Sequence, residues 1–356
     1  MTPADLSLTV LHAVRSAVDD GALTVPDGGV PQSVKVERPR PGGRGDYASS
    51  VALSLARLVG RRPLDVAEVL RERLRQSSGL AAVDITGPGF LNFTLRDDAQ
   101  QSLVRVILRS GQTYGWQAPT GERAEPRHRA DVRAAVTADA LRRILVSQGR
   151  LVRTGCAGAA DPDWALLGVP EVRPDAPGGH GPGHLPTDIA PQPAPYTARE
   201  LARRLGADAA RWGLLSAAAH DHPRLGDELL HQHEGNPLFR VRYAHSRTRA
   251  LLRNAEQLGF DSAAERHIED GHTLAGLLGD HPAVLASAAR HRAPDRVARH
   301  LEAVADALLD FQHTVLPLGD EKPSAAHRSR LALAEAAGTV LAGGLSLLGI
   351  SAPDQI

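Results

Sequence analysis

The segment LALAEAAGTVLAGGLSLLGI (331–350), close to the end of this 356-residue chain, is apolar on every side of the helix that its composition favours. A helix that is apolar all round has to be surrounded by other elements. We find no run that approaches the roughly 18 apolar residues of a membrane span. The segment therefore predicts the central helix of a soluble helical bundle, and it constrains the fold more than any other feature.

Residues 196–356 carry the patterns of further helices that would surround this segment. Thr197-Ala198-Arg199-Glu200 has the spacing of a capping box, in which the threonine and the glutamate close the first turn together. Asn236-Pro237 starts a long helix for which Gly259 is the natural stop. The remaining signals are a stop at Gly206, a start at Asp208 and an amphipathic segment at 297–311. We predict a mainly α helical bundle over 196–356.

Residues 1–112 mix helical and strand-like patterns, which predicts an α+β domain. Two alternating segments, 81–86 and 90–95, flank Gly87-Pro88-Gly89 as strands around a turn. VKVE (34–37) is a further strand candidate, and Asp46 is placed to cap a helix over the residues that follow it. The other helices are expected around Leu6 to Val14, over 63–75 and over 96–111.

Residues 113–195 differ from both ends of the chain in composition and in hydrophobic periodicity. One amphipathic helix is expected from about Asp131 to Gln148, followed by a short strand at 150–156. The stretch 158–195 is dense in proline and glycine and has little periodicity, so it cannot bury enough surface to hold much regular structure. We interpret it as a linker or mobile loop.

Composition excludes several classes of protein. Basic and acidic residues number 41 each, so the chain is not a globally basic protein that coats nucleic acid. The single cysteine, Cys156, excludes a disulfide framework, and together with an N-terminus that lacks signal-peptide character it indicates a cytoplasmic protein. The histidine clusters at 178–184, 220–222 and 231–233 have no recognisable ligand spacing, so we expect no metal site.

The helix after Asn236 is the most informative single element. Its apolar residues, from Val241 to Ala255, fall within an arc of about 100°. Five arginines and no acid lie between Asn236 and Asn254; Arg240 and Arg247 flank one side of the arc, and Arg242, Arg249 and Arg253 flank the other. Arginine forks suit phosphate, but arginines also border buried stripes and reach to water, and composition alone favours the second interpretation.

A second basic run extends from Arg123 to Arg153, with eight arginines and three acids. It is either a phosphate-binding surface or the solvated face of a helix. We interpret it as a solvated face.

Several separated motifs resemble one known family. GDYASSVALSLARLVGRRP (45–63) and VDITGPGFLNFTL (83–95) resemble the N-terminal domain of bacterial arginyl-tRNA synthetases. LGADAARWGLLS (205–216), GNPLFRVRYAHSRTRALLRNA (235–255) and GLSLLGISAP (344–353) resemble the helical anticodon-binding domain, often called the DALR domain, and the C-terminus of those enzymes. The resemblance implies an N-terminal domain that touches the tRNA elbow and a helical domain that packs against the anticodon arm.

The middle of the chain departs from this family. An HIGH-like signature is expected at a strand-to-helix turn, and its best match is Pro126 to Asp131, where His128 occupies the first His position. Ala130 replaces the glycine and Asp131 replaces the second His, which would donate to phosphate. The segment 189–196 lacks the lysine of a KMSK-like loop, and about 60 residues separate the two positions where a doubly wound domain needs about 100 or more.

These features together predict a catalytically inactive paralogue that binds tRNA and needs no cofactor. It would have an α+β domain at 1–112, a shrunken α/β catalytic remnant and linker at 113–195, and a DALR-type bundle at 196–356. The expected tRNA contacts are Asn92 and Phe93 on the elbow side and Arg240, Arg242, Tyr243, His245, Arg247 and Arg249 on the anticodon side. Each has a packing alternative; in particular, Phe93 could point inward.

Two other functions remain open from the sequence. One is an active ligase, or a transferase that uses charged tRNA; the ligase would require ATP. The other is a protein-interaction role, in which the chain pairs with a partner such as a full-length synthetase. The neutral net charge predicts modest tRNA affinity with a strong salt dependence.

Overall fold

The computed structural model describes residues 3–26, 29–39, 44–77, 79–96, 98–170 and 187–356. The chain divides into two units, Met1–Arg105 and Val106–Ile356, and the boundary falls inside helix α4 (Asp98–Ser110). The segments 113–195 and 196–356, which we expected as separate domains, lie in the same unit.

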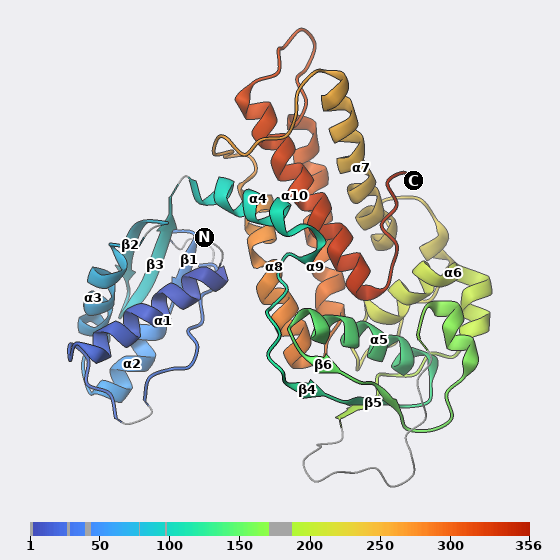
Figure 1. The fold of residues 1–356 in the computed structure, drawn as a ribbon, viewed down its shortest axis with the longest axis horizontal. Coiled ribbons are helices and arrows are strands. Elements are labelled where there is room, and N and C mark those ends of the chain that lie inside the picture. Colours follow the sequence, from blue (N-terminus) through green and yellow to red (C-terminus); the bar gives the residue numbers. More distant parts are fainter. Residues whose placement is uncertain (1–2, 27–28, 40–43, 78, 97, 171–186) are drawn as a thin grey trace. The chain divides into compact units, whose positions relative to one another are not determined.

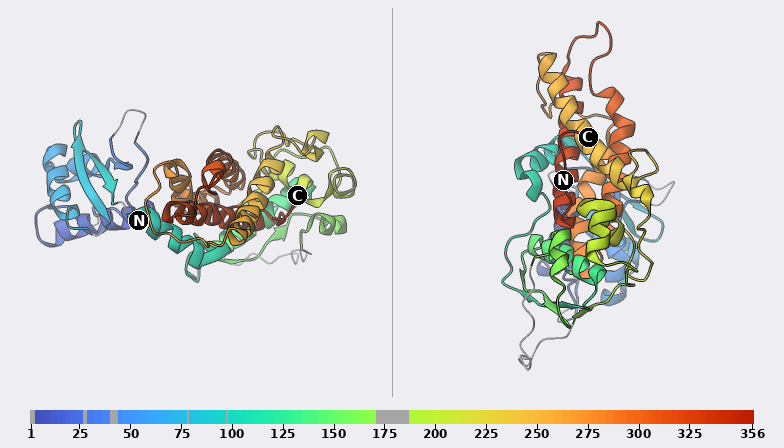
Figure 2. Two further views of the ribbon diagram at one scale, coloured as in Figure 1. Left: turned by 90° about the horizontal axis from the view of Figure 1, so that it is seen from above. Right: turned by 90° about the vertical axis from the view of Figure 1, so that its right-hand side faces the viewer.

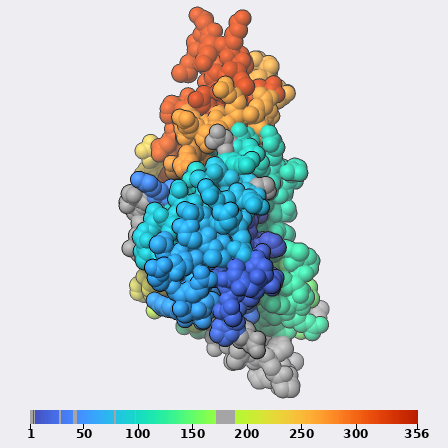
Figure 3. All heavy atoms as spheres, turned by 90° about the vertical axis from the view of Figure 1, so that its left-hand side faces the viewer, coloured from blue at the N-terminus to red at the C-terminus, as the bar shows by residue number. Residues whose placement is uncertain are grey.

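A three-stranded antiparallel sheet in the order β1-β3-β2 organises the first unit (Figure 1). Its elements are α1 (Pro3–Asp19), β1 (Tyr47–Ser49), α2 (Val51–Val59), α3 (Pro63–Leu74), β2 (Leu80–Thr86) and β3 (Phe90–Leu95). The helices pack their apolar sides against one face of the sheet, where Leu91 and Phe93 are fully buried. On the face drawn in Figure 3, the described side chains of this unit (blue to cyan) form a continuous surface.

Two local predictions for this unit are wrong. Asp46 caps no helix; its Oδ2 accepts a hydrogen bond from the backbone N–H of Leu95 at 2.7 Å, and the residues after it pair with β3 as strand β1. Helix α2 therefore begins only at Val51. VKVE forms no strand; within the described residues it makes an isolated bridge between Glu37 and Ala48. In both cases pairing with a distant segment decides the local conformation, which the local pattern cannot show.

Short parallel strands begin the second unit. The elements here are η1 (Gly111–Thr113), β4 (Arg123–Ala124), β5 (Pro126–His128), α5 (Val132–Ser147), β6 (Leu151–Val152), β7 (Gly155–Cys156), η2 (Pro162–Leu167) and β8 (Thr187–Ile189). β4 pairs with β6, and β5 lies between β7 and β8; all three pairings are parallel. Helix α5 is the crossover between the parallel strands; it begins about where the sequence predicts, and Asp131 caps it.

The stretch expected as a linker is only partly tested. Residues 171–186 of it lie outside the described residues. Before them, however, Trp164 and Leu167 of η2 are buried, and η2 packs against α6 (Ala198–Leu215). This part of the stretch is therefore ordered, because a single tryptophan supplies the apolar surface that the proline- and glycine-rich composition lacks.

The remainder of the second unit is a helical bundle around α10 (Ala325–Leu348), as predicted (Figures 1 and 2). Its other elements are η3 (Asp227–Leu230), α7 (Pro237–Gln257), α8 (His272–His291), α9 (Asp295–Phe311) and η4 (Gln312–Thr314). Helix α10 packs against α7, α8 and α9. Glycines permit this close approach, because a Cβ at Gly344 would lie 2.4 Å from Leu301 Cδ2 and one at Gly338 would lie 2.3 Å from Thr248 Oγ1.

The apolar character of α10 needs one correction. By length and composition it could cross a membrane, contrary to our expectation that no segment would. However, 83% of its most apolar 18-residue window is buried inside the protein, so it is a core helix.

Buried charged side chains connect helix α5, which packs on the parallel strands, to the helical bundle. Arg133 of α5 is fully buried, and its guanidinium donates to the backbone carbonyls of Gln192, Leu214, Ala217, Ala218 and Asp221. Arg211 of α6 is equally buried and donates to Asp139 Oδ2, Leu348 O and Leu167 O, each at 2.8 Å. Burial alone would raise the pKa of Asp139, but Arg211, Arg142 and Arg143 prevail and lower it.

Candidate functional site

Helix α7 carries the arginines that the sequence singles out. Asn236 caps it, since its side-chain oxygen accepts from the N–H groups of Leu238 and Phe239 while its amide donates to two carbonyls of the preceding loop. The predicted apolar arc from Val241 to Ala255 is buried except at Leu252, which is partly buried. The arginines therefore emerge on its two flanks, as the spacing predicts.

The first flank of α7 meets α9 and the turn that follows it. Arg240 Nε lies 3.1 Å from Asp306 Oδ1, and Arg247 Nε donates to Gln312 Oε1 at 2.7 Å. Both guanidinium groups are partly covered and have partners within the bundle. This flank supports packing more directly than it supports phosphate binding.

The second flank of α7 is followed by the last residues of the chain. Arg249 Nε lies 3.3 Å from Asp354 Oδ1, and Arg242 Nη2 donates to Ser351 Oγ at 3.3 Å. His245 Nδ1 donates to the carbonyl of Pro353 at 3.0 Å, and burial lowers the pKa of this histidine, which favours its neutral form. The pair of Arg249 and Asp354 is solvent-exposed on both sides, with 46% and 61% of the side chains accessible, so an incoming anion can compete for Arg249.

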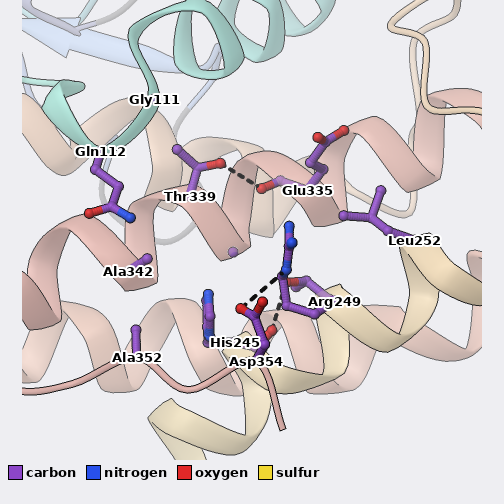
Figure 4. A pocket seen from close by; sticks show the side chains of 12 residues that line it. Gly111, Gln112, His245, Arg249, Leu252, Glu335, Thr339, Ala342, Ala352 and Asp354 are labelled. Atoms are coloured by element: carbon purple, nitrogen blue, oxygen red, sulfur yellow. Dashed lines mark hydrogen bonds and ion pairs between the residues drawn. The ribbon is translucent and has the colours of Figure 1, made fainter.

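A pocket of about 340 Å³ opens beside this flank (Figure 4). Gln112 from η1 lines one side of it, and Arg249 and Asp354 line the other; Glu335 and Thr339 of α10 form the floor between them. The lining is mixed in charge, and Arg249 is its one arginine.

A larger pocket of about 550 Å³ lies near the start of α7. Phe239 and Arg242 of α7, Leu230 of η3 and Ile356 at the chain end contribute to its lining. Tyr243 is 40% exposed and stacks on Phe239 with their ring centroids 5.6 Å apart. An exposed aromatic ring that stacks on a partly buried one beside an arginine is a platform on which an unpaired nucleobase can stack.

Sequence reasoning found Tyr243 but missed Phe239, Leu230 and Ile356. Phe239 lies one turn before Tyr243, and that spacing alone could have paired the two rings. Nothing local places Leu230 or Ile356 beside them, because both come from segments that are distant in sequence.

The predicted residues of the first unit are not exposed. Phe93 is fully buried in the core of the unit, which favours the inward-pointing alternative. Asn92 is 5% exposed, and its amide donates to Thr86 Oγ1 at 2.8 Å. In this conformation neither side chain is presented for stacking or for a phosphate contact.

The turn between β5 and α5 is where an α/β fold usually binds a nucleotide, since it joins the carboxyl end of a central parallel strand to a helix N-terminus. Here the carboxylate of Asp131 lies at that helix N-terminus. Its Oδ1 accepts from the N–H of Ala134 at 2.9 Å, and its Oδ2 lies 3.2 Å from Arg129 Nε. A carboxylate already occupies the helix donor and would repel a phosphate.

His128 and Ala130 complete this turn. His128 is 1% exposed, donates through Nδ1 to the carbonyl of Arg129 and meets Trp164 edge-on with ring centroids 5.5 Å apart. Ala130 Cβ faces Gly158, where an added Cβ would approach it to 3.1 Å. Within the described ranges, no three His, Cys, Asp or Glu residues are grouped so that they could hold a metal ion.

Comparisons with known proteins confirm the family resemblance of the N-terminal and C-terminal parts of the chain. Residues 8–95 match the arginyl tRNA synthetase N-terminal domain family, and residues 241–356 match the DALR anticodon binding domain family. An arginine–tRNA ligase of Frankia alni is 30% identical over an alignment of 556 residues, and one of Renibacterium salmoninarum is 28% identical over 550. Each of these alignments covers 100% of both chains.

Solved structures show the same fold. The arginyl-tRNA synthetase of Thermus thermophilus matches with a TM-score of 0.68 at 16% identity, and that of Plasmodium falciparum matches with a TM-score of 0.68 at 8% identity. Both matches cover 100% of each chain.

Proposed function

The chain belongs to the arginyl-tRNA synthetase family, and we propose that it binds tRNA in the cytoplasm without aminoacylating it. The matched domains support the tRNA half of this proposal, because one of them is an anticodon-binding domain. The turn after β5 supports the non-catalytic half.

Asp131 at the N-terminus of α5 is the observation that carries the loss of catalysis. Adenylation needs donors aimed at phosphate oxygens whose negative charge grows in the transition state. In this chain the corresponding helix end is capped by its own carboxylate, and the preceding His128 is buried against Trp164. No lysine compensates, since Lys35 and Lys322 are the only two in the sequence.

The extent of the parallel sheet supports the same conclusion. The alignment with the Frankia alni enzyme has 556 positions, 200 more than this chain has residues. Between the two matched family domains, the described residues form only short parallel strands around a single crossover helix, α5. A doubly wound nucleotide-binding domain has helices on both faces of a larger sheet, so we infer that most of that domain is missing here.

For the tRNA contacts we propose Tyr243, with Phe239, as the stacking platform and Arg242 and Arg249 as phosphate ligands. Arg240 and Arg247 have partners on α9 and η4, and His245 donates to Pro353 in the segment after α10; these three act as positioning residues for α7. In the first unit, strand β3 is the proposed elbow-side element, with Asn92 as its polar group and Phe93 as its anchor in the core.

ATP–pyrophosphate exchange with arginine and tRNA present tests the loss of catalysis. We expect no exchange above a protein-free control, because the phosphate position is closed by Asp131. Clear exchange activity would identify an active ligase and refute the proposal.

Filter binding of total tRNA tests the tRNA contacts. We expect binding by the wild type and a loss of about tenfold or more in the variant Arg242→Glu/Arg249→Glu, since two phosphate contacts are reversed in charge. The control variant Arg203→Glu/Arg290→Glu changes two exposed arginines on α6 and α8 and should bind as the wild type does. Absence of tRNA binding, together with an RNase-resistant protein partner from cells, would favour the protein-interaction role instead.

A further inference from the structure

The second basic run, Arg123 to Arg153, is not one helix face, because the structure divides its eight arginines by role. Most of them have partners inside the protein. Arg133 binds backbone carbonyls, Arg142 and Arg143 bind Asp139, Arg129 pairs with Asp131 and Arg150 pairs with Glu122. The other three, Arg123, Arg127 and Arg153, lie on or beside the parallel strands.

These three arginines share one face of the parallel strands. Arg123 is paired with Leu151 in the register of β4 and β6, and Arg127 follows four residues later along the same extended segment. The ladder continues past β6, since the N–H of Leu151 donates to Glu122 and that of Arg153 donates to Ala124. Because side chains alternate along a strand, Arg123, Leu151 and Arg153 lie on the same face.

Helix α5 covers the opposite face. Ala124 and Val152, the neighbours of Arg123 and Leu151 in the ladder, are partly buried on the side of α5. Leu151 is 60% exposed, and Arg123, Glu125 and Arg153 are exposed as well. Parallel sheets are normally covered on both faces, and the described residues do not supply such a layer on this outer face.

Charge indicates what this face can bind. We define the outer face as Arg123, Glu125, Arg127, Leu151 and Arg153, which has three basic groups and one acidic group. The guanidinium groups of Arg123 and Arg153 make no hydrogen bond or ion pair with any residue that the structure describes, so they are available. Arginine forks donate two parallel hydrogen bonds to a phosphate, and nucleic acid is a dense row of phosphates.

We propose that the outer face is a second RNA-binding surface, which contacts the phosphate backbone of the bound tRNA outside its anticodon arm. This inference rests on the proposed tRNA binding and assigns a contact that the platform on α7 cannot make. In Figure 1 strands β4 and β6 lie below α5, whereas α7, whose first turns carry the platform, lies above it. We therefore expect that an RNA must extend beyond one stem-loop to reach both surfaces.

Binding of two RNAs to the full chain tests this assignment. The probes are total tRNA and a hairpin with the sequence of one anticodon stem and loop. The variant Arg123→Glu/Arg153→Glu should bind total tRNA about tenfold or more weakly and lower the magnitude of the salt slope by about 2, because two phosphate contacts are lost. Its affinity for the hairpin should equal that of the wild type.

Two comparison variants separate charge from folding. Arg123→Lys/Arg153→Lys keeps both charges and should retain most of the affinity, while Arg203→Glu/Arg290→Glu reverses two exposed arginines elsewhere and should change nothing. Equal thermal unfolding of all variants is expected, since the substituted side chains are exposed.

The outcomes distinguish this inference from the function on which it rests. If the wild type binds no tRNA, the proposed function fails and the inference fails with it. If the wild type binds tRNA and the Arg123→Glu/Arg153→Glu variant binds it equally well, only the inference is overturned. A protein partner that this variant loses, with tRNA affinity unchanged, would also overturn it and assign the outer face to a protein.

Discussion

At the scale of single residues, this protein places several ionisable groups where water cannot reach them. Tyr114, His281 and His300 form a column of rings in the second unit, with neighbouring centroids 5.9 and 5.3 Å apart. Burial lowers the pKa of His281 to about 3 and that of His300 to about 4. Asp139 is the opposite case, because its arginine partners keep a buried carboxylate charged.

The buried histidines predict a loss of stability in mild acid. Histidine in the unfolded chain titrates near pH 6.5. Below that pH the two histidines bind protons in the unfolded chain but not in the folded one. Stability contributed by these groups is complete above pH 6.5 and falls as the pH decreases towards 4. At pH 5 the free energy of unfolding should be lower by up to about 2 kcal/mol for each histidine.

Urea unfolding between pH 5 and 7.5 measures this effect. The variant His281→Leu/His300→Leu should show a much flatter dependence on pH over the same range. Asp139 does not change the stability over this pH range, because its pKa is lowered below the usual 3.8. Its contribution to the free energy of unfolding is therefore lost only at lower pH. An equally steep pH dependence in the variant would assign the acid sensitivity to other groups.

Removal of the carboxylate at position 139 should be costly. Asp139→Asn leaves the guanidinium of Arg211, which is fully buried, without its counter-charge. Breaking a buried ion pair in this way costs about 3–5 kcal/mol, whereas Arg142→Ala removes a partly exposed partner and should cost about 1 kcal/mol or less. Urea unfolding of both variants at pH 7.5 checks the difference; similar small losses would show that Asp139 holds Arg211 only weakly.

At the scale of elements, sequence patterns located those helices whose start and stop signals are local. Helices α5, α6 and α7 begin where expected, next to Asp131, Thr197 and Asn236, and Gly259 follows the end of α7. We did not identify α8, whose apolar residues surround the internal Pro282, a residue that usually ends a helix.

Partners that are distant in sequence account for most of what the patterns missed. Asp46 binds the N–H of Leu95 instead of capping a helix, and Arg249 meets Asp354 near the end of the chain. Only one part of the candidate site was therefore predictable from the sequence. Helical spacing gives the flank on which each arginine of α7 lies. It cannot show that Arg240 and Arg247 are held by α9 and η4, or that Phe93 is buried.

The ends of α7 and α10 allow a matched test of whether a helix-ending glycine is required by its backbone conformation alone or also by the residues packed against it. Both helices end with a glycine at positive φ, Gly259 at 78° and Gly349 at 71°, and with the same hydrogen bond back from the next residue. A Cβ at Gly259 meets nothing within 4 Å, whereas one at Gly349 would lie 2.3 Å from Arg211 Nη2.

Gly349→Ala should therefore be more destabilising than Gly259→Ala. The backbone conformation alone costs about 1–2 kcal/mol in both variants. Displacement of the buried Arg211 adds about 1–3 kcal/mol at position 349 only. Thermal unfolding of the two variants side by side measures the difference, and equal losses would mean that Arg211 shifts freely to make room.

At the scale of the whole molecule, acidic and basic residues are equal in number, and most of the arginines of α5 and α7 have acceptors within the protein. Arg240, Arg247, Arg133 and Arg211 act as internal cross-links. The arginines that we propose to contact phosphate lie on two surfaces, the second flank of α7 and the outer face of the parallel strands. Net charge thus understates the capacity for binding RNA, but it limits how many contacts can form.

This limit predicts a moderate salt slope for binding of total tRNA to the wild-type protein. If Arg242 and Arg249 on α7 and Arg123 and Arg153 on the outer face supply roughly four phosphate contacts, affinity should fall roughly a hundredfold between 50 and 200 mM salt. A globally basic binder with 6–10 contacts loses about 10³–10⁵ over the same range. Filter binding across a salt series gives the slope directly. A slope close to zero would mean that phosphates are not the ligand of these arginines, and a much steeper slope would mean that arginines now paired with internal acids exchange those partners for RNA.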